Sequence, residues 1–151
     1  MSHVQHLWHI VFRTKYSAPT IPEEHEEVLY RYIWRLCKIR KCVLYRINGM
    51  PDHIHLCVEL PPTLSISQFV QQIKTSSHTF LKEQSELFPD FYAWSKGYCA
   101  LTYSGRDKEM IVNYVKRQKV HHKESTFMDE IRALLRESGV KFDEAFLERN
   151  I

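Results

Sequence analysis

The sequence predicts an α+β protein of the ferredoxin-like (RRM-like) class, with an antiparallel sheet of about four strands and helices on one face. The expected elements support this class because they follow the order strand, helix, strand, strand, helix, strand, with further helices after the last strand. The 151 residues show no internal repeat and no interdomain linker, so residues 1–151 are expected to form a single domain. This class of fold hosts many functions and does not by itself indicate one.

The chain begins with a strand and continues with a helix. Residues 5–14 are rich in β-branched and aromatic side chains, which favour a strand. Pro22 opens the helix, and several glutamates follow it where the helix dipole favours negative charge. Apolar residues recur at helical spacing between 28 and 36, and basic residues at 38–41 close the helix.

A β-hairpin and a second helix come next. Residues 42–47 predict the second strand and residues 53–60 the third, and the intervening NGMPD segment at 48–52 has turn-forming residues. Ser65 opens a second helix, whose apolar residues again lie three and four apart. Residues 85–97 are expected to be irregular.

The last third of the chain is expected to hold one strand and two helices. Residues 98–104 predict the fourth strand, which Gly105 ends. A third helix is expected from Lys108 to about His122. A fourth, short helix is expected over 128–137 and ends at Gly139.

Composition narrows the functional classes. The net charge of +3 permits a nucleic-acid partner, but such a partner requires a clustered basic patch. No apolar run approaches the ~20 residues of a membrane span, and the N-terminus lacks a signal-peptide pattern. No two cysteines have the spacing of a zinc knuckle, so we expect buried free thiols and a cytoplasmic location. The cysteines are Cys37, Cys42, Cys57 and Cys99.

Two histidines on the expected third strand form the first candidate site. His53 and His55 are two residues apart, so their side chains point to the same face of a strand. The rise of a strand separates their backbones by about 7 Å, and the two imidazoles can therefore share a metal ion. The alternative is a pair of partly exposed polar residues. Asp52 could be a further ligand, although an aspartate there is also common turn chemistry.

A tyrosine on the third helix forms the second candidate site. Tyr114 and Gln118 are four residues apart and share one helical face. A tyrosine hydroxyl has a pKa of ~10 and is a poor nucleophile at neutral pH. It needs a partner that polarises the phosphate it attacks, and a metal ion can do so. The alternative makes Tyr114 a core aromatic residue in line with Met110 and Ile111.

Basic and aromatic residues are the third feature, since nucleic-acid binding needs donors for phosphates and flat faces for unstacked bases. The alternative is a solvated helix face with ordinary core aromatics. Candidate stacking residues are Trp94, Tyr98 and Tyr103. Candidate DNA-binding residues are Arg13, Lys15, Lys116, Arg117, Lys119, His121 and His122, with Lys123 beside them.

Four segments resemble the single-tyrosine HUH transposases (TnpA type) of small bacterial insertion sequences, the insertion-sequence two-hundred/six-hundred-and-five group. They are WHIVFRTKYSAP at 8–19, NGMPDHIHLCVEL at 48–60, WSKGYCALTYS at 94–104 and IVNYVKRQKVHH at 111–122. The pairing of PDHIHL with YVKRQ in this order and spacing is specific, whereas either motif alone is weak. Cys99 stands where the family often has a glycine, which concerns the local loop geometry and not the chemistry.

The resemblance implies a ferredoxin-like enzyme that cuts and rejoins single-stranded DNA at hairpins near the element's ends. It implies His53 and His55 as metal ligands, Tyr114 as the nucleophile, and Gln118 as a further ligand or orienting group. It also implies a divalent ion, Mg²⁺ or Mn²⁺, and a homodimer. The expected reaction is transesterification through a 5′-phosphotyrosine, without ATP.

Two other functions remain open. One is a ferredoxin-like nucleic-acid-binding module without catalysis, which would keep the basic patch but would not need Tyr114. The other is a histidine-based phosphoesterase or nucleotide hydrolase, which generally needs a third histidine in the motif. Here the next position on that face of the strand is Cys57, which counts against it.

The segment before the third helix suggests how a dimer could share its sites. Gly105, within Ser104-Gly105-Arg106, permits backbone angles that would let the Tyr114 helix swing. Such a helix could dock on its own subunit or serve the histidines of the partner, as in exchange of an element between protomers. The hypothesis is a composite site in the dimer.

Overall fold

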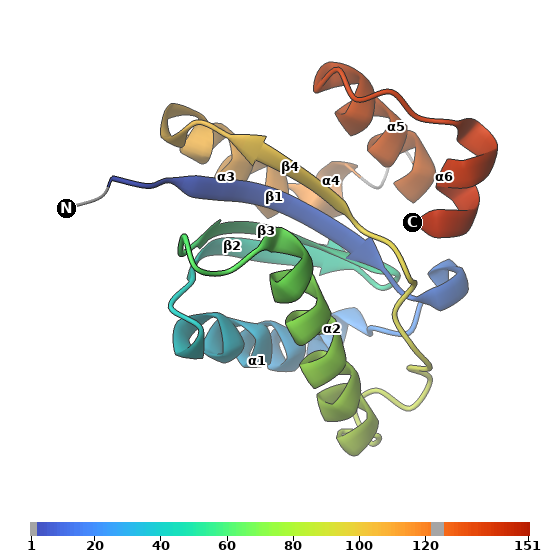
Figure 1. The fold of residues 1–151 in the computed structure, drawn as a ribbon. Helices are drawn as coiled ribbons and strands as arrows, with labels where there is room; N and C mark the ends of the chain where they lie inside the picture. Colours follow the sequence, from blue (N-terminus) through green and yellow to red (C-terminus); the bar gives the residue numbers. More distant parts are fainter. Residues whose placement is uncertain (1–2, 122–125) are drawn as a thin grey trace.

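The computed structural model describes residues 3–121 and 126–151, and within them the core of the fold is one antiparallel sheet (Figure 1). The order across this four-stranded sheet is β2-β3-β1-β4, and neighbouring strands are antiparallel. This arrangement confirms the predicted α+β, ferredoxin-like class. The strands are β1 (His6–Arg13), β2 (Val43–Met50), β3 (His53–Leu60) and β4 (Cys99–Tyr103).

Two helices cover one face of the sheet (Figure 1). They are α1 (Glu26–Ile39), which follows the short 3₁₀ turn η2 (Glu23–His25), and α2 (Ile66–Glu83). Side chains alternate between the two faces along each strand, so Ile10 of β1 and Ile54 of β3 point toward these helices and are fully buried with them. Ser65 begins α2 with a capping box, as its position in the sequence predicts.

The helices that follow β4 pack on the opposite face (Figure 1). Leu7 of β1 and Cys57 of β3 form a cluster there with Ile111 and Val115 of α3. The elements of this part are η3 (Gly105–Asp107), α3 (Lys108–Lys116), α4 (Gln118–His121), α5 (Phe127–Glu137) and α6 (Glu144–Asn150). Helix α6 was not predicted from the sequence.

The hairpin of β2 and β3 is tighter than predicted. Strand β2 continues to Met50, so the turn consists of Pro51 and Asp52 only. Gly49 makes this extension possible because a Cβ atom there would lie 2.3 Å from the carbonyl oxygen of His53. The close approach of the two backbones therefore requires glycine at position 49, and Gly49 belongs to the strand and not to the turn.

The predicted helix from Lys108 to about His122 is interrupted. It divides into α3 and α4 at Arg117, whose N–H contacts the carbonyls of Asn113, Tyr114 and Val115. His122 lies outside the described residues. All four cysteines are free and buried, as expected. None of the helices in the described ranges is long and apolar enough to cross a membrane.

Candidate active site

The two histidines of β3 lie on the sheet face that α3 and α5 cover. Strand alternation points His53 and His55 to this side, opposite the core packed on α1 and α2. In the antiparallel register, His55 faces Val11 and His53 faces Arg13 of β1. Both imidazoles are fully buried. The predicted sharing of one face by the two side chains is therefore observed, and the alternative of partly exposed residues does not apply.

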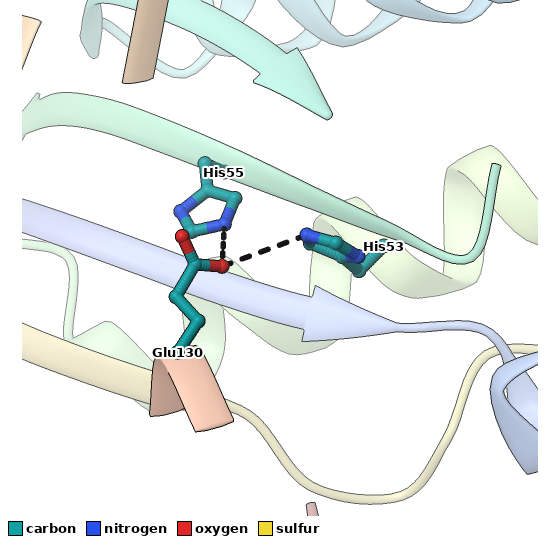
Figure 2. Close-up of side chains that lie close together, drawn as sticks. All are labelled: His53, His55 and Glu130. Atoms are coloured by element: carbon teal, nitrogen blue, oxygen red, sulfur yellow. Dashed lines mark hydrogen bonds and ion pairs between the residues drawn. The ribbon is translucent and has the colours of Figure 1, made fainter. Parts of the chain in front are cut away.

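A buried glutamate on α5 connects the two histidines (Figure 2). Glu130 Oε1 lies 2.9 Å from His55 Nε2 and 3.7 Å from His53 Nε2. The carboxylate is only 5% exposed, so water does not offset the cost of burying its charge. Its contacts with ring nitrogens supply the polar partners that a buried carboxylate needs.

Tyr114 and Gln118 meet at the other oxygen of the same carboxylate. The Tyr114 hydroxyl donates to Glu130 Oε2 at 2.6 Å, and Gln118 Nε2 donates to it at 3.1 Å. Burial raises the pKa of Tyr114 above its ordinary value, and the nearby Glu130 carboxylate raises it further, so the hydroxyl keeps its proton in this arrangement. The two candidate sites of the sequence are thus brought together, by a residue that belongs to neither motif.

Each candidate ligand is also held by a neighbour on its far side. His55 Nδ1 lies 2.8 Å from Nε2 of His9, and His53 Nδ1 lies 2.7 Å from Asp52 Oδ1. Burial lowers the pKa of His9 to about 3, so His9 is neutral at physiological pH. These contacts orient the rings and direct both Nε2 atoms toward Glu130. Asp52 is therefore placed to orient His53, which goes beyond the turn chemistry considered for it.

The donor set fits a divalent cation. Ligand atoms of His53, His55 and Glu130 all lie within 4.8 Å of one another, and all three residues are buried. Imidazole nitrogens and carboxylate oxygens are ordinary ligands of divalent ions. Gln118 Oε1 is buried and has no hydrogen-bond partner among the described residues, which fits a further oxygen ligand or a group that orients one.

The predicted DNA-binding residues occupy several environments. Lys116 and Arg117 are exposed, whereas Lys119 contacts Glu26 at 2.9 Å and the carbonyl of Gly49. Lys119 therefore ties α4 to α1 and β2. The side chain of His121 and the whole of His122 lie outside what the structure describes.

The aromatic candidates are not equivalent either. Trp94 is buried in the core and donates to Ser77 Oγ at 3.0 Å, so it offers no face to a base. Tyr98 and Tyr103 are partly buried. Arg13 lies over the ring of Phe127 at 5.6 Å, beside the histidines, because that ring is 4.7 Å from the ring of His53. Arg13 is thus placed beside the site.

Sequence reasoning missed two residues, Glu130 and His9. A signal for Glu130 was present, because it lies three residues after Phe127 and four before Leu134, within the apolar stripe of α5. An acidic residue inside such a stripe is buried and must find a partner. His9 is two residues before Val11, so it shares the sheet face of the two histidines.

Comparisons with a family and with individual proteins agree, since all of the matches below are transposases. The family described as Transposase IS200 like matches residues 2–118. The transposase for insertion sequence element IS200 of Salmonella typhimurium is 30% identical over 115 residues, which cover 74% of this chain and 75% of that protein. The ISDra2 transposase TnpA of Deinococcus radiodurans is 25% identical over 121 residues, covering 78% and 85%.

A solved structure has a similar fold. It is that of a REP-associated tyrosine transposase bound to a REP hairpin, with a TM-score of 0.59 and 14% sequence identity. The match covers 81% of this chain and 72% of that one. At this identity the likeness concerns the fold.

Proposed function

Because this chain belongs to the IS200-like transposase family, we propose that it cleaves and rejoins single-stranded DNA at insertion-sequence ends through a 5′-phosphotyrosine at Tyr114. The proposed partners are single-stranded DNA hairpins at these ends and a second copy of the chain. The observation that carries the proposal is the shared carboxylate, since Glu130 contacts both the Tyr114 hydroxyl and the histidine pair.

The two oxygens of Glu130 have separate roles in the proposed reaction. His53, His55 and Glu130 would hold a divalent ion, Mg²⁺ or Mn²⁺, beside Gln118 Oε1, and when bound it supplies positive charge that offsets the charge of the scissile phosphate. Glu130 Oε2 already accepts the Tyr114 hydroxyl, so it is placed to take the proton as the hydroxyl oxygen attacks phosphorus.

The bonds balance in both steps. In cleavage, the bond from Tyr114 Oη to phosphorus forms and the bond from phosphorus to the 3′-oxygen breaks, which leaves a free 3′-hydroxyl after that oxygen takes a proton. In rejoining, the 3′-hydroxyl of a second strand attacks the phosphotyrosine, and Tyr114 leaves and recovers its proton. One phosphodiester replaces another, so no ATP is consumed.

The covalent adduct tests this proposal directly. Labelled hairpin DNA from the sequence that flanks the chain's own gene is mixed with the protein and Mg²⁺ or Mn²⁺, and the products are separated under denaturing conditions. The wild-type protein should retain label, and Tyr114→Phe should retain none, because only the attacking hydroxyl is lost. Hairpin binding by Tyr114→Phe should remain within about twofold, since a hydroxyl exchange preserves the ring and its packing.

Tyr103→Phe is the matched control, because Tyr103 lies on β4 and is not a member of the group formed by His53, His55 and Glu130. It should form the adduct like the wild type. An adduct formed by Tyr114→Phe would assign the nucleophile to another residue.

A further inference from the structure

An exposed tyrosine occupies a strained turn beside the candidate active site. Tyr16 follows β1 within η1 (Lys15–Ser17), and its φ of 61° places it in the left-handed region, as does the φ of 53° at Ser17. Non-glycine residues adopt this region at a steric cost, which asparagine and aspartate tolerate best. The Tyr16 side chain is 82% exposed, so apolar burial does not offset that cost.

Hydrogen bonds hold this turn in place. Arg13 Nη1 donates to Ser17 Oγ at 2.9 Å, and Thr14 Oγ1 donates to the carbonyl of Ala18 at 2.7 Å. The N–H of Ser17 also donates to the carbonyl of Thr14 at 3.0 Å. Strained conformations that their surroundings fix in this way are characteristic of functional positions. The effect here is to hold the backbone that carries the exposed Tyr16 side chain.

One ammonium group lies near the ring, and further basic residues line a hollow that the ring borders. Lys15 Nζ lies 5.5 Å from the ring centre of Tyr16 and 5.7 Å from that of Tyr92, which is itself 62% exposed. Next to Tyr16 is a hollow of about 390 Å³ lined by Arg13, Lys15, Tyr16, Ser95, Lys96 and Glu148. Glu148 is the acidic group in this lining, and its carboxylate is paired with Arg132 at 3.3 Å. The lining is therefore net positive.

The turn is also linked to the site. The N–H of Thr14 donates to the carbonyl of Asp52 at 2.8 Å, and the Asp52 carboxylate holds His53. Ser17 lines a second hollow, of about 370 Å³, together with Asp52 and Phe127. Tyr16 thus directly precedes a residue, Ser17, that lines a hollow shared with two neighbours of His53.

We propose that Tyr16 is a stacking platform for an unpaired nucleotide of single-stranded DNA, with Lys15 and Lys96 contacting the phosphates on either side. This inference rests on the proposed function, because it assigns a place to the strand that runs to Tyr114. An exposed ring beside the Lys15 ammonium group and a hollow that Lys96 also lines matches the two needs of single-strand binding, a flat face for a base and cations for the backbone. A base inside a duplex has both faces covered by its neighbours, so the interior of a duplex cannot use the platform.

The test compares two substitutions of Tyr16. Tyr16→Asn removes the ring and suits a positive φ, whereas Tyr16→Phe keeps the ring. The probes are oligo(dT) of 20 nucleotides and a hairpin with single-stranded extensions from the DNA that flanks the gene, and the readout is fluorescence anisotropy. Tyr16→Asn should bind both probes about tenfold more weakly, the loss expected for one stacked base, and Tyr16→Phe should stay within about twofold.

Trp34→Ala is the matched control. Trp34 is also an exposed ring near an ammonium group, with Lys38 Nζ 4.5 Å from its centre, but it lies on α1 at the other face of the sheet. Its substitution should leave both affinities unchanged. An equal loss for Trp34→Ala would show that any exposed aromatic residue contributes, which overturns the assignment to Tyr16.

Abasic substitutions locate the contact. When each nucleotide of the extension is replaced in turn by an abasic one, the wild-type protein should lose affinity at one or two positions, and Tyr16→Asn should lose nothing further there. The inference is wrong if Tyr16→Asn binds as tightly as the wild type, or if it loses the same factor on blunt duplex. These outcomes are independent of the Tyr114 adduct. An intact adduct with an unaffected Tyr16→Asn overturns this inference alone, and a missing adduct with a weakened Tyr16→Asn overturns the nucleophile alone.

Discussion

At the scale of single residues, Glu130 decides how the site is organised. Its Oε1 atom faces the two histidines and its Oε2 atom accepts from Tyr114 and Gln118. In the proposed reaction, this carboxylate would contribute a negative charge to the cation site and a hydrogen-bond acceptor to the Tyr114 hydroxyl. The two contributions can be separated, because an amide keeps the shape of the carboxylate and loses its charge.

Glu130→Gln should therefore weaken the binding of Mn²⁺ by at least about tenfold, since even residues that only support a ligand cost that much. Isothermal titration of the purified protein with MnCl₂ measures this without reference to activity. Glu137→Gln is the control, because it removes an exposed glutamate from the same helix. Unchanged Mn²⁺ affinity in Glu130→Gln would remove the carboxylate from the ligand set.

EDTA should likewise stop formation of the Tyr114 adduct while hairpin binding persists.

The sequence predicts only those site residues that lie close together in the chain. His53 and His55 share a strand, and Tyr114 and Gln118 are four residues apart in the segment expected to be one helix, so local periodicity relates each pair. Glu130 lies 75 residues from His55 and meets it only because α5 packs on the sheet. No local pattern encodes that distance.

At the scale of elements, the predicted strands and the first two helices are confirmed, and the differences have local causes. The break between α3 and α4 contains neither glycine nor proline, and it arises where the Arg117 N–H is shared among several carbonyls. Helix propensity along IVNYVKRQKVHH gives no sign of it. The extension of β2 to Met50 depends on the close approach of β3. The turn-forming residues Asn48 and Gly49 give no sign of that approach, so the sequence predicts a turn there.

Gly49→Ala tests the tight hairpin. A methyl group at Gly49 would overlap the carbonyl oxygen of His53 and approach the Cα atom of Ile54, and both are backbone atoms that cannot turn away. We expect a loss of about 1–3 kcal/mol in the free energy of unfolding, as for other overpacked sites, together with weaker Mn²⁺ binding because His53 shifts. Urea denaturation and metal titration measure the two effects.

Gly105→Ala is the matched control for that substitution. The atoms nearest to a methyl group at Gly105 would belong to the side chain of Gln5, which can rotate away. Its stability should change by less than about 0.5 kcal/mol. Equal stability of Gly49→Ala and the wild type would mean that the two backbones can separate at little cost.

At the scale of the whole molecule, the candidate site extends beyond the part of the chain that the family shares most clearly. The family match ends at residue 118, whereas Glu130 lies on α5. Helices α5 and α6 pack on β1 and β4 through a cluster that includes Val11, Leu101 and Ile131. Arg13 strengthens this attachment by donating to the carbonyl of Glu148 at 2.9 Å. The sheet and these last helices therefore build the site together.

The arrangement of Tyr114 bears on how a dimer would share its sites. In the structure, Tyr114 and His55 of the same chain contact one carboxylate, and Gly105 is part of a 3₁₀ turn with a negative φ. Within this one chain, the helix that carries Tyr114 is thus docked beside the two histidines. To exchange this helix, the two subunits of the proposed homodimer would both have to break the contacts that Tyr114 and Gln118 make with Glu130.

Mixing two inactive variants separates the two arrangements. Tyr114→Phe lacks the proposed nucleophile and His53→Ala lacks a proposed metal ligand, so with the helix docked on its own subunit no heterodimer holds a complete site. We therefore expect no adduct after the variants are mixed under conditions that exchange subunits, which differently tagged chains and native mass spectrometry can verify. Exchange of the helix between subunits would instead restore cleavage, with the covalent DNA on the His53→Ala chain because that chain alone keeps Tyr114. A monomer by light scattering in the presence of hairpin DNA would exclude both kinds of dimer and leave the site within one chain as the working enzyme.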